Sequence, residues 1–359
     1  MVLRVLVVVS SDARRGAEVE GTQLAEQLTA IGHVARSVAL SPAATGGLDV
    51  ECLGSSRLSR STLRRLRRLA REYDVVVAYG SSTLPACAIG LLGTRVPFVY
   101  RSIGDPAAWV RGRVHRWRTG LLFRRAAAVV ALWDDAAASI RGLYRVKAQR
   151  LSVIPNARPP ASGLGGRRAD ARRVLGVPND AELVTVVGAL SPEKRPLLAV
   201  EAVAGTPDAF LLIVGAGRLS DQVAESCGRL LAGRHRMLGV VSPLDDVWAA
   251  TDVVLLTSST EGMPGVLIEA QLAGVPAVSS DVGAVRLVVA DGVSGRLVGA
   301  SEPSEFAAAL QQVLQDRDAM SVAATSHAEQ FSWARVAPLW VDVLGRCTSR
   351  ASGSPIARA

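Results

Sequence analysis

The stretch TSSTEGMPGVLIEAQLAGVPAVSSDVGAVRLVVADGVSGRLV, residues 257–298, is the most informative part of this chain. Apolar runs at Asp252–Thr257 and Val275–Ser280 predict two buried strands, with a short helix between them. A Gly/Pro-rich turn that leaves a strand and enters a helix presents unpaired backbone N–H groups and the positive end of the helix dipole. The sequence therefore predicts a strand–loop–helix unit suited to binding phosphate.

Two carboxylates flank this predicted turn. Glu261 lies in the loop, where it is free to meet a sugar, and Glu269 lies about one turn inside the predicted helix. There the Glu269 carboxylate can accept hydrogen bonds from neighbouring hydroxyl groups of a ribose. The turn supplies four further candidates for substrate binding, namely Gly262, Met263, Pro264 and Gly265. Together these features indicate a nucleotide-sugar site, with an ordinary strand–turn–helix unit bearing surface glutamates as the alternative.

The context of the two glutamates resembles a known family. With their flanking residues, SST-EG-P, EA-LAG-PAV-S-VG and DG-SG-LV, they resemble the Glu-x7-Glu signature of retaining glycosyltransferases of family 4, which have the GT-B fold. The resemblance implies transfer of a sugar from a nucleotide-diphosphate sugar to an acceptor hydroxyl, such as one on a lipid-linked or envelope glycan. It also implies that Glu261 is a catalytic residue, which acts on the transferred sugar, and that Glu269 binds the substrate by holding the donor ribose.

A second motif supplies a cation for the donor. The segment VVGALSPEKRPLL (Val186–Leu198) resembles the family pattern V-G-R-L-x-x-E-K-G, and Lys194 fits the lysine that contacts the donor diphosphate. Ala189 stands where the family has an arginine, and Arg195 is the neighbouring cation expected to substitute in part. Negative charge grows on the departing diphosphate in the transition state. Lys194 and the helix N-terminus are therefore expected to stabilise it as catalytic groups, with no metal and no other cofactor.

The first half of the chain matches the family less closely. In RRGAEVEGTQLAEQL, Gly16 fits the family's glycine-rich loop, where glycine lets the backbone approach a phosphate or sugar, but Arg15 replaces the preceding glycine. The segment VPFVYRSIGDPAAW, residues 96–109, lacks the histidine that the family often has near the reacting sugar. Asp105 is the nearest titratable candidate for substrate binding there, and Arg101 is the nearest cation. Either side chain can instead be structural.

The chain reads as two α/β halves. Strand-like runs alternate with helical patterns, which predicts parallel sheets covered by helices. The runs are Arg4–Val9, Val34–Leu40, Asp74–Tyr79, Phe98–Arg101, Ala127–Leu132, Arg150–Ile154, Leu183–Gly188, Phe210–Val214, His235–Leu238, Val253–Leu256, Ala277–Ser279 and Arg296–Val298. With the GT-B resemblance, the pattern predicts two Rossmann-like domains whose parallel sheets face a central cleft.

Domain limits follow from composition and from the resemblance. An acceptor-binding Rossmann-like domain is predicted over residues 1–160, and a nucleotide-sugar-binding one over residues 161–332, joined by the Pro/Gly-rich stretch NARPPASGLGGRR. WARVAPLWVDVLGRC predicts an amphipathic helix over residues 333–347, which in GT-B proteins crosses back onto the first domain. The small and polar residues 348–359 are expected to be disordered.

Composition places the chain among soluble globular proteins. Its 359 residues are 49% hydrophobic and 20% charged, and four scattered cysteines lack the spacing of a metal site or a disulfide framework, which favours a reducing cytoplasm. Arg4 interrupts the apolar N-terminus, which predicts a buried strand rather than a signal peptide. No apolar run reaches the ~18 residues of a membrane span. Neither Asp134–Asp135 nor Asp245–Asp246 forms an Asp-x-Asp metal motif, so both pairs are interpreted as helix caps.

Positive charge is unevenly placed along the chain. The formal net charge is +9, and seven arginines lie in residues 57–71 and six more in residues 111–125, interleaved with Trp117 and Phe123. Basic amphipathic helices with aromatic residues suit an anionic membrane surface, so peripheral contact with the inner face of the cytoplasmic membrane is one interpretation. A solvated arginine-rich face is the other. Nucleic-acid binding is not expected, because no recognised module accompanies the charge.

Three functions compete at this point. A metal-independent retaining hexosyltransferase is favoured by the donor motifs. A nucleotide-sugar epimerase on the same fold would lack the full Glu-x7-Glu context. A non-catalytic binding or assembly subunit is kept open by Ala189 and by the altered segment at residues 96–109. A nicotinamide-dependent dehydrogenase is disfavoured, because no Gly-x-Gly-x-x-Gly follows the first predicted strand.

Overall fold

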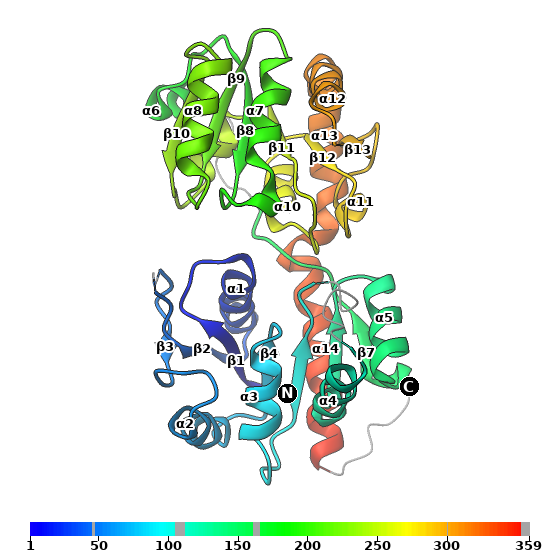
Figure 1. Ribbon diagram of the computed structural model, residues 1–359. Helices are drawn as coiled ribbons and strands as arrows, with labels where there is room; N and C mark the ends of the chain where they lie inside the picture. Colours follow the sequence, from blue (N-terminus) through cyan, green and yellow to red (C-terminus); the bar gives the residue numbers. More distant parts are fainter. Residues whose placement is uncertain (45–46, 105–111, 161–165, 300, 353–359) are drawn as a thin grey trace. The chain divides into compact units, whose positions relative to one another are not determined.

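The protein folds as two compact units (Figure 1). The structure is a computed structural model and describes residues 1–44, 47–104, 112–160, 166–299 and 301–352. Unit 1 comprises Met1–Ala157 and Trp333–Ala359, and unit 2 comprises Arg158–Ser332. Residues 158–160, placed in the first domain from the sequence, therefore fall in unit 2.

Unit 1 is built on a seven-stranded sheet in the order β3-β2-β1-β4-β5-β6-β7, and all its strands pair in parallel. The strands are β1 (Arg4–Ser11), β2 (Val34–Ser41), β3 (Glu51–Cys52), β4 (Val75–Tyr79), β5 (Phe98–Arg101), β6 (Ala128–Ala131) and β7 (Leu151–Val153). The inner strand β4 is buried along its whole length, as expected of a strand covered on both faces. The predicted parallel sheet is confirmed, and β3 is an addition to it.

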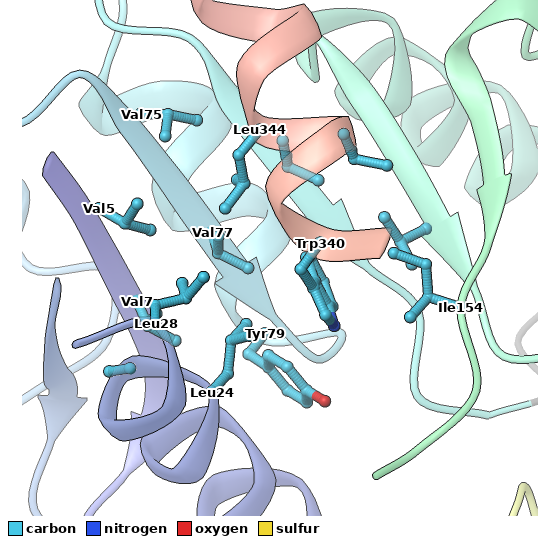
Figure 2. Close-up of a cluster of buried hydrophobic side chains, with 14 of the residues drawn as sticks. Val5, Val7, Leu24, Leu28, Val75, Val77, Tyr79, Ile154, Trp340 and Leu344 are labelled. Atoms are coloured by element: carbon cyan, nitrogen blue, oxygen red, sulfur yellow. The ribbon is translucent and has the colours of Figure 1, made fainter. Parts of the chain in front are cut away.

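The helices of unit 1 include one that follows unit 2 in the sequence. This helix, α14, spans Trp333–Ser352 and so extends past Cys347, where its end was expected. Its side chain Trp340 lies in the same buried cluster as Val7 and Val77 of the sheet (Figure 2). The others are α1 (Gly16–Ala30), α2 (Arg60–Ala70), α3 (Thr83–Gly90), α4 (Gly112–Arg125), α5 (Asp134–Tyr144) and η2 (Ala148–Arg150). The last helix thus completes the core of unit 1.

Unit 2 repeats the arrangement with six parallel strands in the order β10-β9-β8-β11-β12-β13. The strands are β8 (Glu182–Val187), β9 (Ala209–Val214), β10 (His235–Gly239), β11 (Val253–Leu256), β12 (Ala277–Ser280) and β13 (Gly295–Val298). The helices are α6 (Arg168–Leu175), η3 (Pro192–Lys194), α7 (Pro196–Ala204), α8 (Ser220–Leu230), α9 (Asp245–Ala250), α10 (Gly265–Leu272), α11 (Val285–Val288), α12 (Pro303–Gln315), α13 (Arg317–Ala328) and η4 (Glu329–Phe331). Apolar residues of the inner strands, α7 and α12 form its core.

At the amino edge of the unit 2 sheet, one buried carboxylate links several segments through hydrogen bonds and ion pairs. Asp252 directly precedes β11, and it accepts hydrogen bonds from Arg172 Nη2 at 2.7 Å, Leu183 N–H at 2.7 Å and Arg317 Nη1 at 2.9 Å. It also forms an ion pair with Arg168. Burial acts to raise the pKa of Asp252, but the hydrogen bonds and the arginine charges outweigh burial, and the pKa lies below its usual value.

Candidate functional site

The loops that follow β8 and β9 touch at the carboxyl edge of the unit 2 sheet. Gly188 N–H donates to the Val214 carbonyl at 2.9 Å. Gly215 has a φ of +142°, and a Cβ there would lie 1.8 Å from the Gly188 carbonyl oxygen. Only glycine permits so close an approach. In open α/β sheets ligands bind outside the carboxyl ends of the strands, so these loops lie where a ligand is expected.

The turn that carries Lys194 is fastened to the loop after β11. The Thr257 hydroxyl lies 3.0 Å from the Lys194 carbonyl oxygen and 2.9 Å from that of Arg195. In the same region, Ser259 N–H donates to the Glu193 carbonyl at 2.8 Å. These bonds join the lysine motif to the glutamate motif, which lie far apart in the sequence.

The two residues predicted to be catalytic form an ion pair. Lys194 Nζ lies 2.5 Å from Glu261 Oε1, and the Ser258 hydroxyl donates to the same oxygen at 2.7 Å. The Lys194 side chain is 32% exposed and that of Glu261 is 10% exposed, so the lysine is the more open of the two to solvent. The backbone of Glu261 is enclosed as well, because a Cβ at Gly283 would lie 2.0 Å from its carbonyl oxygen. The pair therefore sits on a well-defined loop.

Glu269 is held by an arginine that comes from the start of unit 2. Arg158 Nε donates to Glu269 Oε1 at 2.7 Å. The Glu269 side chain is 27% exposed, whereas that of Arg158 is 4% exposed. Burial raises the pKa of Glu269, while the charge and the hydrogen bond of Arg158 oppose the shift. The Glu269 side chain thus combines a fixed orientation with partial exposure.

The turn at the start of α10 presents backbone groups, rather than side chains, for binding a ligand. Met263 and Pro264 are buried, whereas Gly262 and Gly265 are partly exposed. The Gly262 carbonyl accepts a hydrogen bond from Ala284 N–H at 2.8 Å, which ties the turn to the loop after β12. Within the described ranges, no side chain caps the start of α10. Backbone N–H groups at this helix end are therefore suited to an anion.

Arg195 is engaged by the protein itself. Its guanidinium donates hydrogen bonds to acceptors in neighbouring loops: Thr257 O (2.6 Å), Ser258 O (3.1 Å), Ser280 Oγ (3.0 Å) and Ser301 Oγ (2.6 Å). These are the contacts of a residue that positions the end of β11. Its use as a cation for the donor diphosphate stays a prediction.

The candidates from the first half of the chain lie in unit 1 or outside the described residues. Gly16 is the first residue of α1, and a Cβ there would meet no described atom within 4 Å. Its role at a phosphate or sugar stays a prediction, and Asp105 lies outside the described residues. Arg101 is wholly buried and donates hydrogen bonds to the Ile154 carbonyl and to Asn156 Oδ1. Its role is therefore structural.

Metal-binding side chains do not gather in the described parts of the chain. There, no group of three His, Cys, Asp or Glu residues is placed to hold a metal ion. The four cysteines are free, and burial raises the pKa of Cys87 to about 12. Metal independence stays a prediction, because it rests on the donor motif alone.

Arg158 is the site residue that sequence reasoning missed. Arg158 lies in the Pro/Gly-rich stretch NARPPASGLGGRR, which the sequence indicated only as the link between the two predicted domains. Arg158 and Glu269 are 111 positions apart, so only the fold brings them together. The available signal was that Arg158 is the one charged residue within residues 151–166, and this pattern does not identify a partner.

Two family models match the chain. The model for glycosyl transferases group 1 matches residues 167–330, and the model for the glycosyl transferase 4-like domain matches residues 13–157. The chain belongs to the family 4-like glycosyltransferases of the GT-B fold. Lys194, Glu261 and Glu269 all lie within the residues that the group 1 model matches.

Curated relatives share parts of the sequence. The D-inositol 3-phosphate glycosyltransferase of Geodermatophilus obscurus is 34% identical over 227 residues, which cover 58% of this chain and 50% of the relative. The protein of that name in Nocardiopsis dassonvillei is 32% identical over 265 residues, which cover 68% of this chain and 60% of the relative. The chain thus spans about half the length of the curated relatives it matches.

Solved structures show the same fold. The crystal structure of Anabaena HepE in complex with UDP has a TM-score of 0.81 at 22% identity, covering 96% of this chain and 100% of that one. Sucrose-phosphate synthase from Thermosynechococcus elongatus has a TM-score of 0.79 at 18% identity, covering 97% of this chain and 100% of that one. These likenesses confirm the predicted GT-B architecture.

Proposed function

We propose that the protein is a retaining glycosyltransferase that moves a sugar from a nucleoside-diphosphate sugar to an acceptor hydroxyl. The observation that carries the proposal is the Lys194–Glu261 pair, 2.5 Å apart, on the loop that leads into α10. A partly exposed ammonium group and a helix N-terminus both bind phosphate. The two neighbouring glutamates suit hydroxyl groups of a sugar and a ribose. Family membership supports the same reaction.

The proposed reaction needs no protein nucleophile. The acceptor oxygen forms a bond to the anomeric carbon while the bond from that carbon to the diphosphate oxygen breaks. The acceptor proton passes to the departing diphosphate on the same face of the sugar, so the anomeric configuration is retained. Lys194 and the backbone N–H groups at the start of α10 stabilise the charge that grows on the diphosphate. Glu261 orients the transferred sugar, and Glu269 holds the ribose.

Similar proteins suggest which substrates to try first. HepE was crystallised with UDP and with UDP-glucose, so uridine is the first base to test. The curated relatives are named for D-inositol 3-phosphate, which makes it the first soluble acceptor to compare with a lipid-linked glycan. A soluble acceptor would need no membrane contact, whereas a lipid-linked one would.

A binding screen followed by a transfer assay tests the proposal. Nucleoside diphosphate at ~100 times its dissociation constant should stabilise the protein by ~2.7 kcal/mol, which a thermal shift detects. Nuclear magnetic resonance of the product should then show the anomeric configuration of the donor. Glu261→Gln should lower turnover and leave nucleoside diphosphate affinity unchanged. A protein that binds no nucleotide, or a product of inverted configuration, would contradict the proposal.

The same assays separate the competing functions. An epimerase would change the donor without any acceptor, and a non-catalytic subunit would bind nucleotide without transfer or donor hydrolysis. Turnover should persist in a strong chelator, because Lys194 and α10 supply the positive charge. Loss of turnover in chelator, with recovery on adding magnesium or manganese, would contradict the metal-independent scheme.

We also propose that unit 1 contacts an anionic membrane surface through α4. Val114 and Trp117 are 70% and 66% exposed, and with exposed Leu121 they recur at helical spacing on one face. α4 contains no acidic residue and carries five exposed arginines. Such a helix suits the interface of an anionic bilayer. Over the described residues, no helix has both the length and the apolarity to cross a bilayer.

The other arginine cluster serves as the control for this contact. On α2, Leu66 is buried and Arg65 pairs with Glu51, so its outer face offers charge without an apolar stripe. In sedimentation with anionic vesicles, Trp117→Ala should remove binding that persists at high salt. Arg64→Ala on α2 should affect only the salt-sensitive part. A protein that stays in solution at low salt would mean that both clusters are solvated faces.

A further inference from the structure

Arg158 is a buried cation that the proposed reaction does not yet use. It is the first residue of unit 2, and its side chain is 4% exposed. A charge removed from water requires a partner, and Glu269 supplies a carboxylate 2.7 Å from Arg158 Nε. Arg158 is thereby in contact with one of the two glutamates assigned to the donor.

The start of α10 leaves space for the Arg158 guanidinium. A Cβ built at Gly265, the first residue of α10, would lie 1.8 Å from Arg158 Nη2 and 2.4 Å from Arg158 Cζ. Any side chain at Gly265 would therefore displace the guanidinium or the helix end. The backbone of Gly265 carries no positive φ that would itself demand glycine. Room for Arg158 is thus the reason for a glycine at this position.

We propose that Arg158 is a positioning residue of the donor site, which fixes the Glu269 carboxylate for the ribose hydroxyls, and that Gly265 admits its guanidinium. The inference rests on the proposed function, because it takes Glu269 to hold the ribose. Arg158 acts through Glu269 and not on the reacting atoms. Its loss should therefore weaken donor binding and raise the donor KM, while kcat at saturating donor stays close to that of the wild type.

The charges around Glu269 give the inference a pH dependence. Arg158 lowers the pKa of Glu269, while burial and the nearby Asp245, on α9, raise it. The ionised carboxylate is the form that accepts two hydroxyl hydrogen bonds. Binding of nucleoside diphosphate should fall as the pH drops through this pKa. Without Arg158 the pKa rises further, so the fall should begin at a higher pH.

A double-mutant cycle on Arg158 and Gly265 tests the inference. Arg158→Ala and Gly265→Ala should each weaken binding of UDP, or of whichever nucleoside diphosphate the wild type binds, by about ten-fold or more in calorimetry. The double variant should bind no worse than Arg158→Ala alone, because alanine at 265 harms only by displacing the arginine. Additive losses, or a harmless Gly265→Ala, would overturn the inference.

Matched controls separate these effects from general damage. Gly228→Ala places the same methyl group on α8, where a Cβ meets no described atom within 4 Å, and it should leave binding unchanged. Arg173→Ala removes an exposed arginine from an ion pair with Asp170 and should do the same. Should Arg158→Ala fail to fold, Arg158→Lys keeps the charge without the guanidinium. It should restore folding with weakened nucleotide binding.

The pH profile supplies a readout that a purely structural arginine would not move. The acid-side fall in nucleotide binding should shift to higher pH in Arg158→Ala and be absent in Glu269→Gln. In the Glu269→Gln background, removing Arg158 should cause no further loss. If the wild type binds no nucleoside diphosphate, the proposed function fails and this role fails with it. If the wild type binds and Arg158→Ala matches its affinity and pH profile, only the role of Arg158 is wrong.

Discussion

Each unit has a cation–carboxylate pair at the carboxyl edge of its parallel sheet, and the two pairs differ in exposure. In unit 1, Arg101 Nη2 lies 3.4 Å from Glu20 Oε1, and the side chains are 0% and 3% exposed. In unit 2, the side chains of Lys194 and Glu261 are 32% and 10% exposed. The same position in the same kind of sheet thus holds a buried pair in unit 1, here called the sealed pair, and a partly exposed pair in unit 2, here called the reachable pair.

The surroundings of the two cations account for the difference. The Arg101 guanidinium lies over the rings of Tyr79 and Trp340, 5.9 and 5.6 Å from their centroids. Lys194 instead ends a short helix at a loop that solvent reaches. A sealed pair acts on stability, and removal of one partner leaves the other charge buried. In a solvent-exposed pair, one residue can exchange its partner for the charge of a ligand, so exposure distinguishes the pair with a proposed function from the structural pair.

Arg101→Ala should give the largest effect and should act on stability. It leaves Glu20 buried without its cation, which costs about 3–5 kcal/mol of unfolding free energy. Urea unfolding followed by circular dichroism measures the loss. Arg173→Ala, in an exposed pair whose side chains are 74% and 73% exposed, is the control and should change little. Equal stability of Arg101→Ala and the wild type would remove the contrast between the units.

Lys194→Ala should act on turnover rather than on stability. Removing a group that stabilises the departing diphosphate should lower kcat by ~10²–10³, or ~2.7–4 kcal/mol. Lys147→Ala, an exposed lysine in unit 1, is the control and should retain full activity. If Lys194→Ala had normal kcat and lowered stability, the Lys194–Glu261 pair would be structural, as the Arg101–Glu20 pair is.

Asp252→Asn tests whether the charge that stabilises unit 2 lies at the amino edge of its sheet, opposite the edge that holds the Lys194–Glu261 pair. The expected loss at neutral pH is about 3 kcal/mol, at the low end for a buried pair, because Arg168 and Arg317 reach solvent. The lowered pKa of Asp252 means that its stabilisation is present above the unfolded pKa of ~3.9 and is lost as pH falls through the folded value. Unfolding curves between pH 7 and pH 2 should therefore show a shallower acid decline for the variant. An unchanged decline would show that Asp252 is not the titrating group.

Glu269→Ala should have the smallest effect of the four. Loss of a charged hydrogen bond to the ribose should weaken nucleoside diphosphate binding by roughly 1.5–3 kcal/mol in calorimetry. Glu225→Ala, which removes an exposed carboxylate from α8, should bind as the wild type does. Unchanged binding by folded Glu269→Ala would exclude Glu269 from the donor site. Lys194 would then be the residue that still supports a donor site at the carboxyl edge of the unit 2 sheet.

Features set by neighbours in the chain were predictable from the sequence. Apolar runs gave the parallel strands of both units, and the loop between β11 and α10 was expected from its turn residues. The strand β3 was missed because its two residues are too few to show a period. Local sequence patterns therefore predicted the fold and identified residues of the candidate site, and the roles of these residues stay predictions.

Features set by distant contacts were not predictable. Arg101 was interpreted either as the nearest cation to the reacting sugar or as a structural residue, and the sequence did not decide between the two. Its partner Asn156 is 55 positions away, and that contact exists only in the folded unit. Arg158 was missed for the same reason. A side chain's burial depends on what the whole fold brings against it, and spacing in the sequence does not carry that information.

The two ends of unit 2 lie side by side. Arg158 N–H donates to the Phe331 carbonyl at 3.0 Å, and Arg158 pairs with Ser332 in a parallel bridge. Unit 2 therefore sits between Ala157 and Trp333 as a single insertion into unit 1. A module whose ends meet can be exchanged at one junction. Because its two ends meet, unit 2 is a module that can be replaced as a whole while the fold of unit 1 stays intact.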